Sequence, residues 1–119
     1  MQLKDLEVYK LAREASRDIW KIYDGWGWQD KKLFGDQLVG ATDSIGANIA
    51  EGFGRFHYLD KNKFNYNARG SLLEAIYWLD TATERGRINN SDSEQISAKF
   101  ENLHKKLNSY INVTKKQTV

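Results

Sequence analysis

The chain has 119 residues, with 18 basic and 16 acidic side chains, no cysteine and no proline. This length suits a single domain over residues 1–119, and the lack of cysteine excludes disulfides and thiolate metal sites. Mixed charges over residues 1–20, and the lack of any long uncharged apolar run, argue against a signal peptide and a membrane span. We therefore expect a cytoplasmic protein with no membrane partner.

The N-terminal half of the chain predicts two amphipathic helices. Apolar residues recur every three or four positions over residues 4–24, and Gly25 suits the left-handed position that follows many helix ends. A second helix is expected over residues 30–53, with Asp30 as its N-cap. Each glycine inside this helix costs about 1 kcal/mol relative to alanine. This cost favours close approach of another helix to the face of Gly46, Ala50 and Gly54, and the alternative is a glycine-rich helix that tertiary packing tolerates.

The C-terminal half predicts two further helices. The third is expected to begin at its N-cap Asp60 and to end at Gly86. The fourth is expected to begin at the capping box formed by Ser91 and Glu94 and to continue to about residue 114. Because the connections are short, sequential helices should be antiparallel neighbours. The predicted fold class is all-α, an antiparallel up-down-up-down four-helix bundle.

Polar residues occupy core-like positions on the second and third helices. Glu51 and Arg69 are the natural ion pair, because a buried carboxylate needs a partner or takes up a proton. Asn48 is placed to bond Ser71 or Glu74. We interpret these five residues as a buried polar network that fixes the register of the helices rather than as a catalytic group.

Basic side chains flank the third helix near several aromatic rings. This arrangement is compatible with RNA binding by phosphate pairing and base stacking, and equally with solvated helix ends in a chain of low net charge. The candidate nucleic-acid-binding residues are Arg55, Lys61, Lys63, Arg85 and Arg87.

Aromatic residues make up 13% of the chain, which is more than the core-facing sides of the four predicted helices need. Tryptophan and tyrosine are enriched at protein interfaces. The aromatic residues that lie outside the core-facing side of each helix therefore predict a homo-oligomer interface. The alternative is a wide core with rings that reach the surface. The candidate interface residues are Trp20, Tyr23, Trp26, Trp28, Tyr66, Tyr77 and Trp78.

No catalytic or metal-binding pattern is recognisable. Glu101 and His104 supply one Glu-x-x-His half of a di-metal site, but His57, the other histidine, has no glutamate at the matching position. Ser44 and Ser71 have no histidine at a predictable distance for a hydrolase triad. The sequence therefore predicts a non-enzymatic protein without a cofactor.

One segment resembles a known family signature. Residues 44–55 read S-I-G-A-N-I-A-E-G-F-G-R and are similar to the S-I-P-x-N-I-A-E-G-x-G-R motif of the 23S rRNA-intervening-sequence proteins, with Gly46 where that family usually has proline. Residues 4–12 and 68–74 resemble its other blocks. The resemblance implies a four-helix bundle that assembles into homopentameric rings. A similar bundle is the accessory protein of diversity-generating retroelements, which binds nucleic acid and a reverse transcriptase.

Two functional hypotheses follow from the sequence. The first is a self-assembling scaffold or adaptor that presents a surface to a protein or RNA partner. The second is a nucleic-acid-binding accessory protein that acts on rRNA or beside a reverse transcriptase. Steep weakening of binding between about 50 and 200 mM salt would indicate the second.

Overall fold

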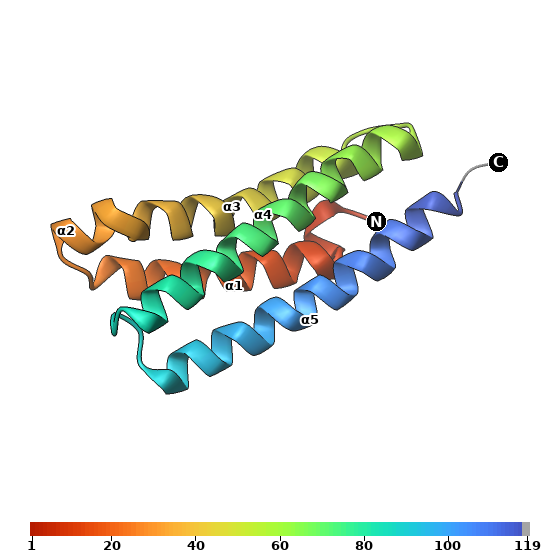
Figure 1. Cartoon of the computed structure of the whole chain (residues 1–119). Coiled ribbons are helices and arrows are strands. Elements are labelled where there is room, and N and C mark those ends of the chain that lie inside the picture. The colour runs from red at the N-terminus through yellow and green to blue at the C-terminus, as the bar shows by residue number, and fades with distance from the viewer. Residues whose placement is uncertain (118–119) are drawn as a thin grey trace.

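A computed structural model describes residues 1–117 of the chain as a bundle of helices, without strands in that range (Figure 1). The predicted all-α fold class is confirmed. The four long helices are α1 (Glu7–Asp24), α3 (Asp36–Phe53), α4 (Tyr58–Glu84) and α5 (Asn90–Lys115). The short elements are the 3-10 turn η1 (Leu3–Asp5), the helical turn α2 (Trp28–Asp30) and the π-helical turn η2 (Lys31–Gly35).

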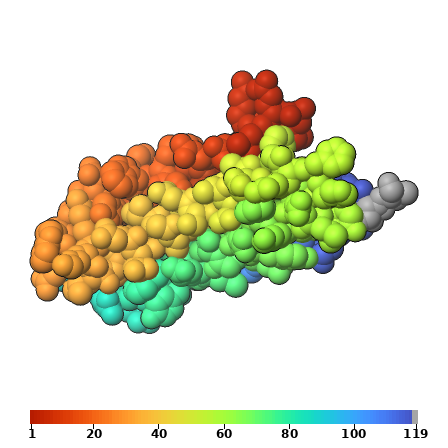
Figure 2. Space-filling model, turned by 90° about the horizontal axis from the view of Figure 1, so that it is seen from above, coloured from red at the N-terminus to blue at the C-terminus, as the bar shows by residue number. Residues whose placement is uncertain are grey.

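The four long helices form a rod of about 50 × 22 × 21 Å. Helices α3 and α5 each pack against both α1 and α4, so α1 and α4 occupy diagonal corners. The N-terminus, the α3–α4 turn and the last turns of α5 lie at one end, here called the terminal end (Figure 1). The first residues stand out from the side of the rod near that end (Figure 2). No described helix is long and apolar enough to cross a membrane.

Helix α4 supplies one wall of the core through a regular alternation of large and small residues. Leu72 and Leu79 are fully buried, and Ala68, Ala75 and Ala82 lie between and beside them with no exposed surface. Each buried leucine stabilises the fold by about 1.5–3 kcal/mol. Because the alanine side chains are small, the neighbouring helices approach that face of α4 closely.

The close approach of a helix to α3 occurs at Gly52 rather than at the predicted face of Gly46, Ala50 and Gly54. A Cβ atom on Gly52 would lie 2.9 Å from the backbone oxygen of Lys61 and 3.1 Å from the Cβ of Phe64, both on α4. Gly46 faces Ala12 of α1 at an ordinary contact distance of 3.6 Å. Within α3, the contact with α4 is therefore the one that requires glycine.

The end of α4 follows the predicted glycine stop. Gly86 has a φ of 73°, the left-handed conformation that glycine adopts without strain. The Arg87 amide donates to the Ala82 carbonyl at 2.9 Å and the Gly86 amide donates to Thr83 at 3.0 Å, which together form a Schellman motif. Ile88 is buried directly after it. Gly25, in contrast, has a φ of −82°, so its predicted left-handed conformation is wrong.

Three predicted N-caps are also wrong. Asp30 lies at the end of α2 and pairs with Arg87, whereas the N-cap of that turn is Gly27. Helix α4 begins two residues before Asp60, which leaves this carboxylate in the first turn, where it complements the helix dipole. Helix α5 is capped by Asn89.

Asn89 replaces Ser91 as the N-cap because it offers the same chemistry two residues earlier. Its side-chain oxygen accepts a hydrogen bond of 2.8 Å from the backbone amide of Asp92. Asparagine and serine are comparably good caps, so local sequence alone did not distinguish them. The predicted capping box of Ser91 and Glu94 is therefore inside the helix rather than at its start.

Candidate functional site

The predicted ion pair between Glu51 and Arg69 does not form. Glu51 is exposed and accepts a hydrogen bond of 2.7 Å from Arg55, one turn further along the chain. Arg69 instead donates through Nη1 to the Oδ1 atom of Asn108 on α5, at 3.0 Å. Neither side chain joins α3 to α4.

The rest of the predicted buried network is also wrong. Asn48 donates from Nδ2 to the Ser44 carbonyl of its own helix at 2.8 Å. Ser71 is half-buried and Glu74 is exposed. The physical reason is helical phase, since Asn48 and Glu51 each precede a buried residue and are therefore rotated away from the core by about 100°.

The polar residues that are buried lie elsewhere, and one of two buried asparagines on α4 ties that helix to α5. Asn62 donates from Nδ2 to the Ile111 carbonyl at 3.2 Å, and Asn65 donates from Nδ2 to Asn62 Oδ1 at 3.0 Å. The sequence contained a signal for both, because they continue the buried stripe of Ala68 and Leu72 backward at steps of three. Their polarity concealed them from a search for apolar periodicity.

The predicted interface aromatics separate into two groups. Trp26 and Trp78 pack against the core of the bundle, and Trp26 also donates from Nε1 to the Arg87 carbonyl at 3.0 Å. These two rings are therefore explained within one chain. Tyr23 is half-buried and donates its hydroxyl to Asp36 at 2.6 Å, and this bond raises the pKa of the tyrosine. Trp20 stacks on Tyr23 with ring centres 5.3 Å apart.

The exposed predicted aromatics are Trp20, Trp28, Tyr66 and Tyr77. Trp28 lies in the turn between α1 and α3, and Trp20 lies on α1 beside a groove that Asp43 of α3 also lines. Tyr66 and Tyr77 lie on α4, which occupies the corner diagonal to α1. The exposed rings are therefore distributed over two opposite sides of the rod.

Helix α4 carries a second apolar stripe on its solvent side, which we call the outer stripe. Successive members of the stripe, which are named at the end of this paragraph, lie seven, four, three and four residues apart in the chain. They therefore follow one side of the helix. Its apolar members are exposed, and Gly70 has no atom of another described element within 4 Å of the position its Cβ would take. The outer stripe consists of Leu59, Tyr66, Gly70, Leu73 and Tyr77.

The predicted nucleic-acid-binding residues do not form one surface. Lys63 and Arg85 are 22 positions apart on and beside α4, which corresponds to about 33 Å. Arg55 is engaged by Glu51, and Lys61 donates to the Phe53 carbonyl at 3.2 Å.

At the other end, Arg87 pairs with Asp30 at 2.9 Å. Arg85 lies over the Phe34 ring at 5.5 Å from its centre. The grouping predicted from the sequence therefore mixes residues from opposite ends of the rod.

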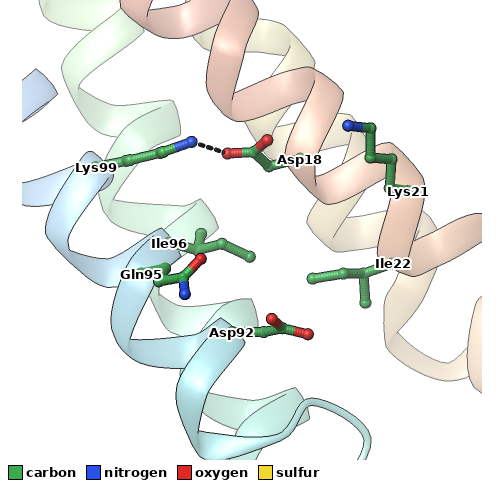
Figure 3. Close-up of a pocket in the computed structure, with 7 residues that line it drawn as sticks. All are labelled: Asp18, Lys21, Ile22, Asp92, Gln95, Ile96 and Lys99. Atoms are coloured by element: carbon green, nitrogen blue, oxygen red, sulfur yellow. Dashed lines mark hydrogen bonds and ion pairs between the residues drawn. The ribbon is translucent and has the colours of Figure 1, made fainter.

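A cavity of about 230 Å³ lies between α1 and α5 (Figure 3). The Lys99 ammonium extends from α5 toward Asp18 on α1, where it also pairs with Glu14 at 2.9 Å. These two carboxylates raise the pKa of Lys99. The cation therefore bridges the two helices and is neutralised by them.

The geometry defines a class of protein, the antiparallel four-helix bundle with exposed apolar side chains on diagonal helices. The chain belongs to the 23S rRNA-intervening sequence protein family, whose model matches residues 4–109. This match confirms the resemblance that residues 44–55 indicated.

Among solved structures, the chain is similar to a protein of unknown function from the S23 ribosomal protein family of Bacteroides thetaiotaomicron. The two are 25% identical with a TM-score of 0.81, and the match covers 87% of this chain and 97% of that chain. No curated protein matches this chain.

Proposed function

We propose that this chain is a cytoplasmic, non-enzymatic scaffold or adaptor that assembles with copies of itself and presents the assembled surface to a protein or RNA partner. The outer stripe of α4 carries the proposal. Leu73 and Tyr77 expose 51% and 60% of their surface side by side on one helix. Exposed apolar side chains that gather in this way are typical of a binding surface.

Gly70 supports a closely approaching partner helix. An exposed glycine inside a helix costs about 1 kcal/mol relative to alanine, and nothing within the described subunit explains the cost. The steps of three and four along the outer stripe match those of a coiled-coil seam. A second helix that packs on this stripe would use the space above Gly70 and bury the two neighbouring side chains.

The diagonal placement of α1 and α4 supports a ring. A closed ring uses two different surfaces on each subunit, one for each neighbour. The outer stripe of α4 supplies one surface, and the exposed Trp20 on α1, at the opposite corner, supplies the other. The family resemblance favours five copies.

The substitution Gly70→Gln tests the assembly. It should raise the helix propensity of the isolated subunit by up to about 1 kcal/mol, because glutamine is a better helix former and meets no clash. The same side chain would fill the space that a partner helix needs. We therefore expect sedimentation velocity to show an oligomer for the wild type and a monomer for the variant. The monomeric variant should melt at the same temperature as the wild-type monomer.

Val113→Gln is the matched control, because Val113 is 55% exposed on α5 and lies outside the outer stripe. It should leave the oligomer intact. A wild-type chain that sediments as a monomer at high micromolar concentration would contradict self-assembly. An oligomer that survives Gly70→Gln would remove the outer stripe from the interface.

A second proposed function, the nucleic-acid-binding accessory role, is favoured by the distribution of charge. Residues 61–73 and 102–117 contain seven of the 18 basic residues and none of the 16 acidic ones. These two stretches are the start of α4 and the end of α5, which contact each other at the terminal end. A polyanion is the partner that such a surface attracts.

A further inference from the structure

Helix α1 carries its charged side chains on two different flanks. Its acidic residues Glu7, Glu14 and Asp18 are seven and four positions apart, so they share the flank that faces α5. Lys106 pairs with the first of them, and Lys99 pairs with the other two. The acidic flank of α1 is therefore neutralised by a neighbouring helix of the same chain.

The flank of α1 that lies next to α3 is basic and keeps its charge. Arg13 and Arg17 are exposed, and neither guanidinium forms an ion pair with a carboxylate of residues 1–117. Trp20 lies on the same flank and exposes 53% of its surface. An exposed indole that adjoins two unpaired arginines is typical of a protein interface, where tryptophan and arginine are both enriched.

This basic flank borders a groove between α1 and α3, which pack against each other. Two adjoining hollows of about 310 and 140 Å³ form the groove, and Arg13, Ser16 and Asp43 line both. The lining contains three basic side chains and one acidic side chain. Tyr9 lines one end and Trp20 the other, eleven positions apart on α1, or about 16 Å. The groove is therefore long enough for about three turns of a second helix.

The outer stripe of α4 has the length and the charge that this groove would receive. Tyr66 and Tyr77 are also eleven positions apart, so the central part of the stripe spans about 16 Å. The last eleven residues of α4 contain three acidic side chains and no basic one. Glu74 lies beside the stripe, and Asp80 and Glu84 continue it beyond Tyr77. All three carboxylates are exposed and form no ion pair with residues 1–117.

The charges of the two surfaces lie at matching heights along the rod. The Trp26 indole donates to the Arg87 carbonyl, so these two residues, which follow the ends of α1 and α4, are at one level. Arg13 is thirteen positions before Trp26, and Glu74 is thirteen positions before Arg87. Because α1 and α4 run in the same direction, Arg13 and Glu74 are at nearly the same height (Figure 1). Two copies that pack side by side in one orientation therefore bring this cation and this carboxylate together.

We propose that the groove between α1 and α3 binds the outer stripe of α4 from a second copy of this chain, which lies in the same orientation and pairs its Glu74 with Arg13. This inference rests on the self-assembly proposed above and names the surface that receives the outer stripe. Asp80 and Arg17 form a second pair, because they are seven and nine positions before the same two residues at the helix ends, a difference of about 3 Å. Complementary charges of this kind fix the register of an interface and exclude other partners.

Gly70 fits the same register. It is seventeen positions before Arg87, as Tyr9 is before Trp26, so this glycine of one copy faces the Tyr9 ring of the next. Gly70 has open space where its Cβ would lie. A second copy rather than an unrelated protein is the occupant, because one chain supplies both surfaces, on diagonal helices, with equal length and opposite charge.

Sedimentation velocity of charge-exchange variants of the full chain tests the proposal. Arg13→Glu should raise the dissociation constant of the oligomer about tenfold, because two carboxylates would then face each other. Glu74→Arg should weaken the oligomer equally, because two arginines would face each other. The double variant Arg13→Glu/Glu74→Arg exchanges the two charges and should assemble like the wild type.

Lys105→Glu is the matched control, because Lys105 is exposed on α5, outside both surfaces, and the change in charge equals that of Arg13→Glu. It should assemble like the wild type. Far-UV circular dichroism should be unchanged in every variant, since Arg13 and Glu74 are exposed and have no ion pair among residues 1–117. Arg17→Glu/Asp80→Arg exchanges the second pair independently, so the register is still tested if a change in the first pair impairs folding.

The outcomes separate this interface from self-assembly itself. A wild-type chain that sediments as a monomer would overturn both, and would leave the groove to a protein of another sequence. An oligomer that both single variants retain would overturn the interface and keep self-assembly. Two weakened single variants whose double variant stays dissociated would overturn the pairing of Arg13 with Glu74, because lost contacts rather than matched charges would then explain them.

Discussion

The contact between α3 and α4 and the contact between α1 and α5 hold the same bundle together by different physics. At the first, Gly52 brings the backbone of α4 within 2.9 Å of where a side chain would begin, and fully buried leucines and isoleucines fill the remainder. At the second, Lys99 reaches across to carboxylates on α1 beside a cavity of about 230 Å³, and Lys106 pairs with Glu7 further along the same two helices. One contact depends on shape and the other on charge.

This difference indicates which part of the molecule tolerates change. A close-packed contact loses energy with any change of volume, because the interior has no spare room. A contact bridged by partly exposed ion pairs is worth little per pair and is screened by salt. Substitutions at the two contacts should therefore have effects of different size and different dependence on solution conditions.

The largest expected effect is at the core side of α4. Leu72→Ala should lower the free energy of unfolding by about 2–5 kcal/mol, because Leu72 is fully buried and its truncation leaves a cavity. Ile22→Ala, at the half-buried wall of the cavity between α1 and α5, should cost only about 1 kcal/mol. Urea denaturation measures both. Equal costs would show that the two contacts do not differ as described.

The next effect concerns glycine at two positions of the same helix. Gly52→Ala should destabilise the protein by about 1–3 kcal/mol, because the new methyl group would contact backbone that cannot withdraw. Gly40→Ala should instead stabilise it by up to about 1 kcal/mol, since no atom of another described element lies within 4 Å of that position. Thermal melting of the two variants measures both effects. A stabilising Gly52→Ala would mean that α4 can move away.

A smaller effect is expected at Lys99. Lys99→Met should cost about 1 kcal/mol or less at low salt, because the pairs with Asp18 and Glu14 are partly exposed. The difference from the wild type should shrink as salt is raised, which Leu72→Ala should not show. Melting curves across a salt series provide the measurement, and a salt-independent difference would indicate packing rather than charge.

The smallest effect is a loss of stability in alkali. Hydrogen bonds to carboxylates raise the pKa of Lys99 above its ordinary 10.5 and that of Tyr23 above 10.0, and burial raises the pKa of Tyr110. The folded chain therefore holds these protons more tightly than the unfolded chain. The resulting stability is complete below the ordinary pKa values and is lost as pH rises through the raised ones.

Melting temperatures between about pH 8 and pH 11 should show this decline for the wild type. The decline should be shallower for the double variant Lys99→Met/Tyr23→Phe, which lacks two of the three groups. A decline of equal steepness in both proteins would assign the alkaline loss to other residues.

The sequence predicted the four long helices because apolar periodicity is a local property that each segment displays alone. It misplaced details that depend on a choice between neighbours. The sequence pattern places Glu51 in the core, whereas Gly52, one residue later, is the position that faces it. Asn89 and Ser91 are both good caps, and the helix begins after the first.

The candidate site was harder to predict because it joins distant stretches. Nearness to the third helix in the sequence groups Lys63 with Arg85, although the two residues lie at opposite ends of the rod. The structure instead joins Arg69 to Asn108 of α5, 39 positions later. The register between α4 and α5, to which the buried Asn62 contributes a hydrogen bond, is not encoded in any single segment.

The uneven charge along the rod has a consequence for any cyclic assembly. Rotational symmetry orients every subunit in the same direction, so the positive ends would all gather on one rim. The opposite rim would receive the turns that contain Trp28 and the Asp30–Arg87 pair. Such a ring has two chemically distinct faces, and a partner approaching from solution would encounter a polarity that no isolated subunit displays at that strength.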